Sequence, residues 1–288
     1  MLLNVHFLIK HDIIKTCRIQ KKNDISGVMK VKIGFFDSGV GGLTVLGEAL
    51  KRIPNHEYLY YADTTHTPYG SKPREEVRQY VIEAIDFLIN KGAEIIVIAC
   101  NTATSIAAAE LREKYSIPII GMEPAVKPAL EISQKVNKRV LVTATALTLK
   151  EEKMKKLLEQ FDANHRVDLC PLPGLVKLAE KFDFTDESVI SYLKEAFSSY
   201  DLTAYGSVVL GCTHFPLFKK QFKQLFSSDV VLVDGSQGTV KHLEEIVLEK
   251  SCLVEKASVK FYSSGILAQT PSELKPFKNI LTQLGVNL

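Results

Sequence analysis

Short runs of apolar residues alternate along this chain with longer stretches in which apolar positions recur every three or four residues. A strand buried on both faces has a continuous β-branched or aromatic run, whereas an amphipathic helix carries a single apolar stripe. The continuous runs predict strands at residues 33–36, 58–62, 95–99, 117–121, 139–143, 167–169, 208–210, 230–233 and 259–263. Since helical stretches separate most of them, the pattern predicts βαβ units and a mainly parallel sheet.

The helical stretches complete a layout that occurs twice. Apolar positions at helical spacing predict helices over residues 43–53, 73–90, 149–161 and 189–197, and a small-residue tract predicts another after Cys100. The last predicted strand returns to the first half. We therefore predict an α/β fold with two domains, residues 29–122 plus about 237–288 and residues about 123–236, preceded by an appended or disordered extension over residues 1–28.

Two of the predicted strands end in the same way. The run at residues 95–99 leads into Cys100, Asn101 and Thr102, and the run at residues 208–210 leads through Gly211 into Cys212, Thr213 and His214. In open parallel sheets, ligands bind at the carboxyl ends of the strands. A lone buried cysteine is usually a small apolar residue. Two cysteines in matching contexts call for a common explanation.

The first predicted strand is followed by a glycine-rich turn that contains Asp37, Ser38 and residues 39–42. Such a turn lets backbone N–H groups approach a ligand, and the helix that follows points its positive end there, so the turn suits an anion. It lacks the residues of a P-loop and the spacing of a dinucleotide site. Asp37 alone is equally explained as a helix cap. A second loop, residues 63–71, is rich in hydroxyl groups and could line a polar pocket.

Composition and charge narrow the class of protein. The 288-residue chain is 46% hydrophobic, and its formal charge of +3 lies entirely within residues 1–28, so we expect no nucleic-acid partner. No apolar run is long enough to span a membrane, and the interrupted start is a poor secretion signal. The five cysteines are odd in number and widely spaced without a CxxC pair, which favours a reducing compartment, the cytoplasm.

Two thiols facing one cleft have a specific chemistry. One thiolate could remove a proton from a carbon acid while the other thiol donates a proton to the opposite face, which inverts the carbon. A redox pair normally needs adjacent CxxC cysteines, and a phosphatase needs Arg six residues after Cys, where Ile106 and Phe218 stand. Helix amino ends are expected to lower the pKa of both Cys100 and Cys212. Asp37 and His214 are the neighbours suited to assist them.

Four blocks together resemble bacterial glutamate racemase of the aspartate/glutamate racemase superfamily. They are residues 37–42, 68–70, 99–103 and 211–217, in the order and spacing of that family, and the resemblance covers roughly residues 29–265. It implies two similar α/β domains, each a mainly parallel sheet flanked by helices, with the active site in the cleft between them. It also implies an isomerase that needs no cofactor and no metal.

The resemblance implies roles for individual residues. Cys100 would act on the α-proton of D-glutamate with help from Asp37, and Cys212 on that of L-glutamate with help from His214. The residues implied to bind substrate are Asp37, Ser38, Tyr69, Gly70, Asn101, Thr102, Thr213 and His214. D-Glutamate would supply peptidoglycan precursor synthesis, and hence cell wall and cell shape. A small-molecule substrate is the expected partner, and a homodimer is left open.

The sequence departs from the family pattern at three places, and three alternative functions stay open. His66 stands where the family often carries Arg, residues 1–28 match nothing in the family, and residues 170–180 align poorly, so the pairing of Glu180 with His214 stays open. Aspartate racemase is the nearest alternative, although His214 favours glutamate. A carboxylate-binding module on the same scaffold is a second. A lyase or decarboxylase that uses a single cysteine is a third.

Overall fold

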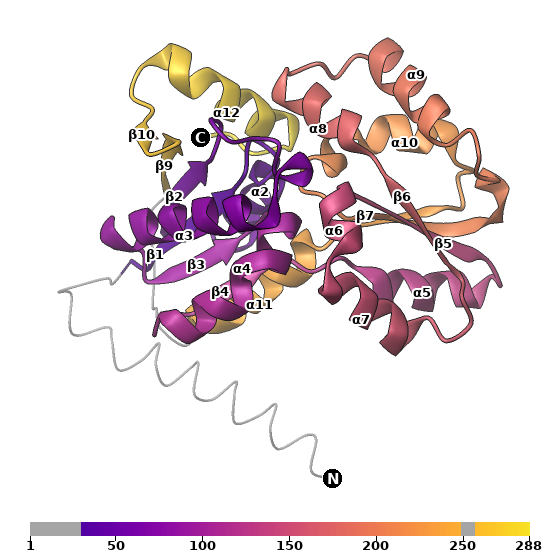
Figure 1. Ribbon diagram of the computed structural model, residues 1–288. Coiled ribbons are helices and arrows are strands. Elements are labelled where there is room, and N and C mark those ends of the chain that lie inside the picture. Colours follow the sequence, from indigo (N-terminus) through magenta and orange to yellow (C-terminus); the bar gives the residue numbers. More distant parts are fainter. Residues whose placement is uncertain (1–29, 249–256) are drawn as a thin grey trace, which may run out of the picture.

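The computed structural model describes residues 30–248 and 257–288. They form two β-sheets, each flanked by helices, that lie next to each other in the molecule (Figure 1). This arrangement confirms the predicted α/β class with parallel sheets. The predicted extension, residues 1–28, lies outside the described residues.

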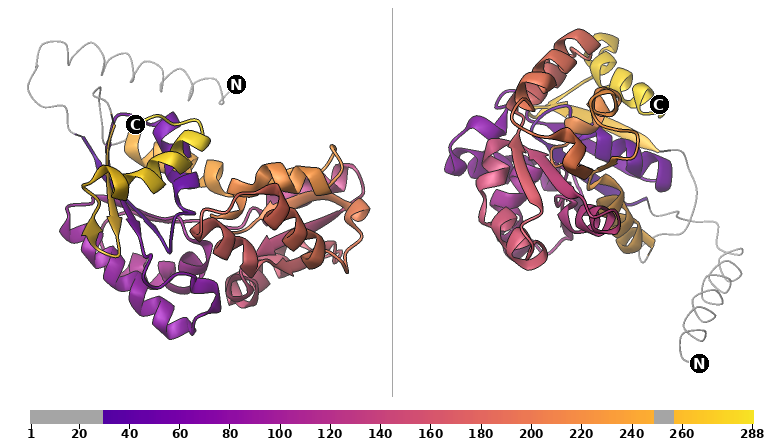
Figure 2. Two further views of the ribbon diagram at one scale, coloured as in Figure 1. Left: turned by 90° about the horizontal axis from the view of Figure 1, so that it is seen from above. Right: turned by 90° about the vertical axis from the view of Figure 1, so that its right-hand side faces the viewer.

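The first sheet has six strands, and most of them come from the first half of the chain. In spatial order they are β10 (Ile266–Leu267), β9 (Ser258–Ser263), β2 (Glu57–Ala62), β1 (Lys32–Asp37), β3 (Ile95–Ile98) and β4 (Ile119–Gly121). All neighbours are parallel except β10, which runs antiparallel to β9. Because β9 pairs with β2, the end of the chain returns to the first sheet, as predicted (Figure 2).

The second sheet is smaller and is built from one continuous part of the chain. Its four parallel strands are, in spatial order, β6 (Val167–Pro171), β5 (Arg139–Ala144), β7 (Tyr205–Leu210) and β8 (Val231–Val233). The central strands β5 and β7 are buried almost throughout, in keeping with their continuous apolar runs. The carboxyl ends of β1, β3 and β7 carry most of the residues predicted to be functional, whereas Tyr69 and Gly70 follow β2.

Helices cover both sheets. Those beside the first are α2 (Leu43–Arg52), α3 (Arg74–Asn90), α4 (Asn101–Lys114), α11 (Ser236–Leu248) and α12 (Pro271–Gln283). Those beside the second are α5 (Val126–Lys135), α6 (Ala146–Lys150), α7 (Glu152–Phe161), α8 (Pro173–Glu180), α9 (Asp186–Ala196) and α10 (Lys219–Leu225). No helix in the described part of the chain is sufficiently long and apolar to cross a lipid bilayer.

The helix predictions differ from the structure in two ways, because one predicted helix is broken and several helices were not predicted. The single helix predicted over residues 149–161 is wrong, because Glu151 has an extended backbone that ends α6 and begins α7. Helices α5, α11 and α12 were not predicted, and neither was α8. Its start, Pro173 and Gly174, is typical of a turn, and it becomes helical where Gly174 packs under the ring of Tyr192 and donates its N–H to the Tyr192 hydroxyl at 2.9 Å.

The predicted domain boundaries near residues 122 and 237 stay a prediction. The strands of the first sheet all fall in residues 29–122 or 237–288, and those of the second in residues 123–236. Helix α11 begins at the second boundary and packs against α2 and β4 of the first sheet.

Candidate active site

Cys100 lies at the elbow between β3 and α4. The four residues of β3 are all buried, which fixes the end of the strand in the core, and Cys100 is the N-cap of α4. Its sulfur accepts the N–H of Ala103 at 3.5 Å and donates to Ser38 Oγ at 3.7 Å. The Cys100 side chain is therefore held between the helix start and the glycine-rich turn.

The expected lowering of the Cys100 pKa is wrong. Burial, together with the nearby Asp37 charge, outweighs the N–H of Ala103 and raises the pKa of the Cys100 thiol to about 12. A helix amino end favours the thiolate only modestly, whereas removal from water disfavours it strongly. Cys100 is thus a protonated thiol at neutral pH until a base takes its proton.

The glycine-rich turn does bind an anion, and that anion is a side chain of this protein. The N–H of Val40 donates to Glu180 Oε1 at 2.8 Å, and Glu180 is the last residue of α8. A Cβ atom on Gly39 would lie 1.8 Å from the same oxygen. The turn therefore needs glycine at position 39 so that α8 of the second half can approach.

Cys212 forms the second elbow together with His214. Cys212 Sγ lies 3.5 Å from His214 Nδ1, and His214 Nε2 lies 2.6 Å from Glu180 Oε1. Only 1% of the His214 side chain is exposed. The open question of the partner of His214 is thus answered by geometry: it is Glu180. The segment after Cys212 is a 3-10 helix, η4 (Phe215–Phe218), followed by α10, so the α-helix dipole expected at this elbow is weaker than at Cys100.

His214 keeps its proton in spite of its burial. Removal from water lowers the pKa of the imidazole, but the hydrogen bonds to Cys212 and Glu180 outweigh this effect, and the pKa stands well above its ordinary value. A cationic imidazole donates from both ring nitrogens, one toward Cys212 Sγ and one toward Glu180. The arrangement supplies a proton donor beside the second thiol.

Asp37 ends β1 and lies behind both elbows. Its Oδ1 accepts the N–H of Gly39 at 3.0 Å, and its Oδ2 accepts the Thr213 hydroxyl at 2.9 Å. The carboxyl group is fully buried, and burial raises its pKa to about 6 although the His214 charge lowers it. A carboxylate with a pKa near neutrality suits proton exchange.

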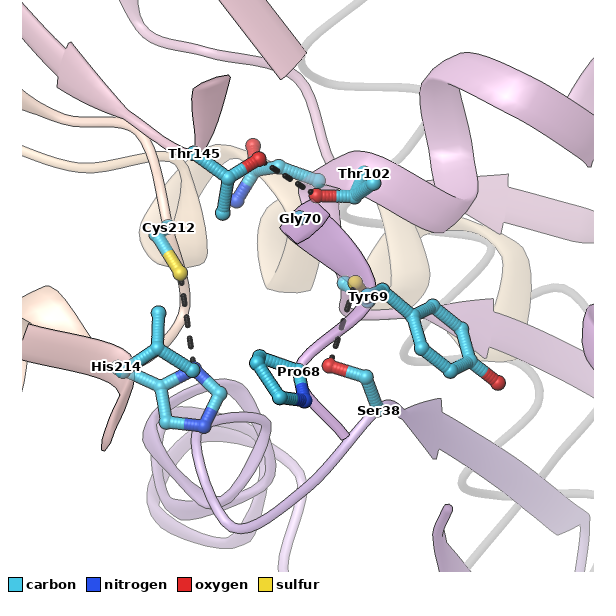
Figure 3. A pocket seen from close by; sticks show the side chains of 11 residues that line it. Ser38, Pro68, Tyr69, Gly70, Thr102, Thr145, Cys212 and His214 are labelled. Atoms are coloured by element: carbon cyan, nitrogen blue, oxygen red, sulfur yellow. Dashed lines mark hydrogen bonds between the residues drawn. The ribbon is translucent and has the colours of Figure 1, made fainter. Parts of the chain in front are cut away.

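One cavity joins the two elbows (Figure 3). Its lining consists of Ser38, Pro68, Tyr69, Gly70, Cys100, Asn101, Thr102, Thr145, Val176, Cys212 and His214. In Figure 3, Cys212 and His214 lie on one side and Ser38, Pro68 and Tyr69 on the other. The cavity volume is about 10 Å³. That is room for about one water molecule, so a larger ligand enters only when the walls part.

The structure gathers most, but not all, of the predicted site residues at the cavity. Asp37 and Thr213 are the two that do not line it; they lie behind it, in contact with each other. Asn101 Oδ1 is buried at the cavity without a partner among the described residues, as expected of an acceptor kept for a ligand. Every residue role stays a prediction at this point.

Several cavity residues were missed by the sequence analysis. Thr145 and Val176 line the cavity from the second half of the chain. Thr145, Thr148 and Thr102 form a triangle of hydroxyl groups with Oγ1–Oγ1 distances of 2.9 to 3.0 Å. The only signal for Thr145 was its position just after a strand, and nothing in the sequence pointed to Val176.

His66, which stands where Arg was expected, is outside the cavity. Its Nδ1 lies 2.9 Å from both oxygens of Asp63, and its ring stacks on Tyr80 at 3.8 Å between centroids. Asp63 also accepts the hydroxyl of Tyr69. His66 therefore supports the cavity wall from behind.

Comparisons with known proteins show the family of this chain. The family model described as Asp/Glu/Hydantoin racemase matches residues 44–243. Glutamate racemase of Halothermothrix orenii is 49% identical over 257 residues, covering 88% of this chain and 100% of that relative.

Solved structures of glutamate racemases are similar over nearly their whole length. That of Campylobacter jejuni has 32% identity and a TM-score of 0.73, covering 88% of this chain and 98% of that one. That of Francisella tularensis in complex with D-glutamate has 26% identity and a TM-score of 0.73, covering 90% and 95%. The chain belongs to the Asp/Glu/Hydantoin racemase family, among its glutamate racemases.

Proposed function

We propose that this protein interconverts L-glutamate and D-glutamate by proton transfer at the α-carbon between two cysteines. The observation that carries the proposal is that Cys100, from the first half, and Cys212, from the second, line one cavity. The substrate follows from the family and from the D-glutamate bound by the Francisella relative. The sequence pattern, the geometry and the relatives converge on one reaction.

The chemistry begins with D-glutamate in the cavity. The Cys100 thiolate takes the α-proton, and the Cys212 thiol gives a proton to the opposite face of the carbanion, which forms L-glutamate. The reverse direction exchanges the two roles. The α-proton of an amino acid is weakly acidic, so the reaction depends on groups that hold each sulfur in the required protonation state.

Asp37 and His214 are the proposed assisting groups. The Cys100 thiol has a pKa raised to about 12 by burial, so it needs a base, and Asp37 is the buried carboxylate whose charge acts on it. His214 is positioned at 3.5 Å from Cys212 Sγ and is held by Glu180 on its other side. We therefore assign Asp37 to Cys100 and His214 to Cys212.

Most of the groups that hold the substrate in this proposal are uncharged. The start of α4 presents backbone N–H groups and the Thr102 hydroxyl to a carboxylate. The unpartnered Asn101 Oδ1 can accept a hydrogen bond from the α-ammonium group. The predicted set of substrate contacts is completed by Asp37, Ser38, Tyr69, Gly70, Thr213 and His214. We further propose that the D-glutamate formed supplies peptidoglycan precursors in the cytoplasm, and a homodimer remains open.

The test is proton exchange in deuterated water. Purified protein is incubated with L-glutamate, D-glutamate and, in parallel, L-aspartate, and the loss of the α-proton signal and the optical rotation are followed. We expect racemisation of glutamate with deuterium incorporation, abolished by Cys100→Ser and by Cys212→Ser. Cys170→Ser is the matched control, because Cys170 is buried but lies outside the cavity.

The other outcomes separate the alternatives. Exchange of aspartate alone would identify an aspartate racemase. A change of product mass would identify a lyase or decarboxylase. Full activity in either the Cys100→Ser or the Cys212→Ser variant would contradict the two-thiol mechanism. Binding of glutamate without exchange would favour the carboxylate-binding module.

A further inference from the structure

A two-thiol racemase ends each turnover in the wrong protonation state for the next one. Conversion of D-glutamate leaves Cys100 as a thiol and Cys212 as a thiolate, the reverse of the starting state. Before another D-glutamate can react, one proton must leave the first sulfur and one must reach the second. The cavity offers little water for this, since it has room for about one molecule. The inference below rests on the proposed function.

Thr213 touches the groups assigned to both thiols. Its Oγ1 donates to Asp37 Oδ2 at 2.9 Å and lies 3.5 Å from His214 Nδ1. The same Nδ1 lies 3.5 Å from Cys212 Sγ. A hydroxyl can donate and accept at once, so it is suited to stand between a carboxyl group and an imidazole.

The contact between Thr213 and His214 is shielded from solvent. A Cβ atom on Gly41 would lie 2.5 Å from both Thr213 Oγ1 and His214 Nδ1, so the backbone of the glycine-rich turn covers the pair directly. Asp37, Thr213 and His214 are all buried. No water can enter between them without moving the turn.

We propose that the Thr213 hydroxyl passes a proton from Asp37 to His214 after each turnover and thereby returns both thiols to their starting protonation states. The contacts of Oγ1 with both groups, and their cover by Gly41, carry the proposal. Thr213 acts through Asp37 and His214, in addition to its predicted contact with substrate.

The transfer balances. The Cys100 thiol gives a proton to the Asp37 carboxylate, and His214 gives the proton on Nδ1 to the Cys212 thiolate. Protonated Asp37 then gives its proton to Thr213 Oγ1 while the Thr213 hydroxyl gives its own to His214 Nδ1. One proton has left Cys100 and one has reached Cys212, and the three groups between them end as they began. The opposite substrate drives the same steps in reverse.

The test compares the first turnover with later ones. Protein and glutamate are mixed at similar concentrations, quenched over time and resolved by enantiomer, for Thr213→Val, which lacks the hydroxyl, and Thr213→Ser, which keeps it. For Thr213→Val we expect a burst whose rate reflects any lost contact with substrate, followed by a steady rate about tenfold or more below the burst rate of the same variant. The burst amplitudes with D- and L-glutamate should add up to about one per active site, because each protonation state accepts one enantiomer.

Controls separate this role from a structural one. Thr213→Ser should show no burst, and neither should Thr143→Val, which removes another buried hydroxyl that bonds only to the carbonyl of Val209. If Thr213→Val does not fold, as judged by circular dichroism, Thr213→Ala provides the same comparison. Equal slowing of first and later turnovers, or unchanged rates, would overturn the proposal. Absence of racemisation in the unmodified protein would instead overturn the proposed function, and the relay with it.

Discussion

At the scale of single residues, Asp37 is held at an energetic cost. Its pKa is raised from 3.8 to about 6 by burial, so the folded protein binds this proton more tightly than the unfolded chain. The free energy of unfolding therefore falls as the pH rises between about 4 and 6, and the loss is complete above that range. The carboxylate that we assign to catalysis destabilises the fold at neutral pH.

Replacement of Asp37 by Asn should therefore stabilise the protein while it removes activity. At pH 7 we expect the free energy of unfolding to rise by up to about 3 kcal/mol, and by about half as much at pH 5. Urea unfolding at both pH values measures the difference. Asp229→Asn is the control, because Asp229 is exposed. A stability gain that does not grow from pH 5 to pH 7 would contradict the assigned burial cost.

A second residue-scale prediction concerns Glu180. Glu180→Gln removes the negative charge that helps to raise the His214 pKa, so the imidazole should lose its proton at lower pH. Because the pKa of His214 is higher in the folded protein than in the unfolded chain, its protonation stabilises the fold at pH values below the unfolded pKa. This stabilisation is lost as the pH rises through the folded pKa. We expect the basic limb of the pH profile of kcat with L-glutamate to move to lower pH. The exposed Glu187→Gln should leave that limb in place.

The sequence was a better guide to which residues lie at the cavity than to their pKa values and contacts. Cys100, Cys212 and His214 were placed correctly at the cavity because each follows a strand of a parallel sheet. The direction of the Cys100 pKa was wrong, because local order suggests a helix dipole whereas burial depends on distant packing. Glu180 stayed open for the same reason: its partner arrives from another part of the fold.

At the scale of elements, the glycine-rich turn and α8 depend on each other. Gly39→Ala would place a methyl group on Glu180 Oε1, so the carboxylate must leave both Val40 N–H and His214. We expect racemisation to fall by about 10² or more, with a thermal midpoint lowered by only a few degrees.

The matched control for this substitution lies in α11. Gly238 has no neighbouring atom within reach of an added Cβ, and it sits inside a helix. Gly238→Ala should keep full activity and raise stability by about 0.5 to 1 kcal/mol. Comparable activity losses in both variants would show that the loss in Gly39→Ala does not come from the contact between Gly39 and Glu180.

Helices and strands with a strong pattern of apolar residues were predicted from the sequence. Those whose bounds depend on contacts with distant residues were not. The buried strands β1, β3 and β7 follow from their apolar runs. Helix α8 was missed because the glycine near its start favours a turn, and at that point the Gly174 N–H donates to the hydroxyl of Tyr192 on α9. The break at Glu151 likewise interrupts an apolar stripe that looks continuous in sequence.

At the scale of the whole molecule, one cavity between the two halves should protect both thiols together. Cys100 and Cys212 are 5% and 7% exposed, and the closed cavity must open for reagent and substrate alike. With D-glutamate we expect alkylation of both by iodoacetamide, followed by mass spectrometry, to slow to the same extent. Alkylation of the buried Cys170 should not respond. Protection of one cysteine alone would place the ligand elsewhere.

The pairing of β9 with β2 has a consequence for how the protein is made. Glu57 faces Ser258, so during synthesis β2 must wait for its neighbour until about 200 further residues have left the ribosome. Until then, β2 is an open edge that can pair with other nascent chains, whereas the second sheet is complete once β8 has emerged. Translation interrupted between β8 and β9 would therefore yield products with one finished sheet and one aggregation-prone sheet. Chaperone dependence should concentrate in the first sheet.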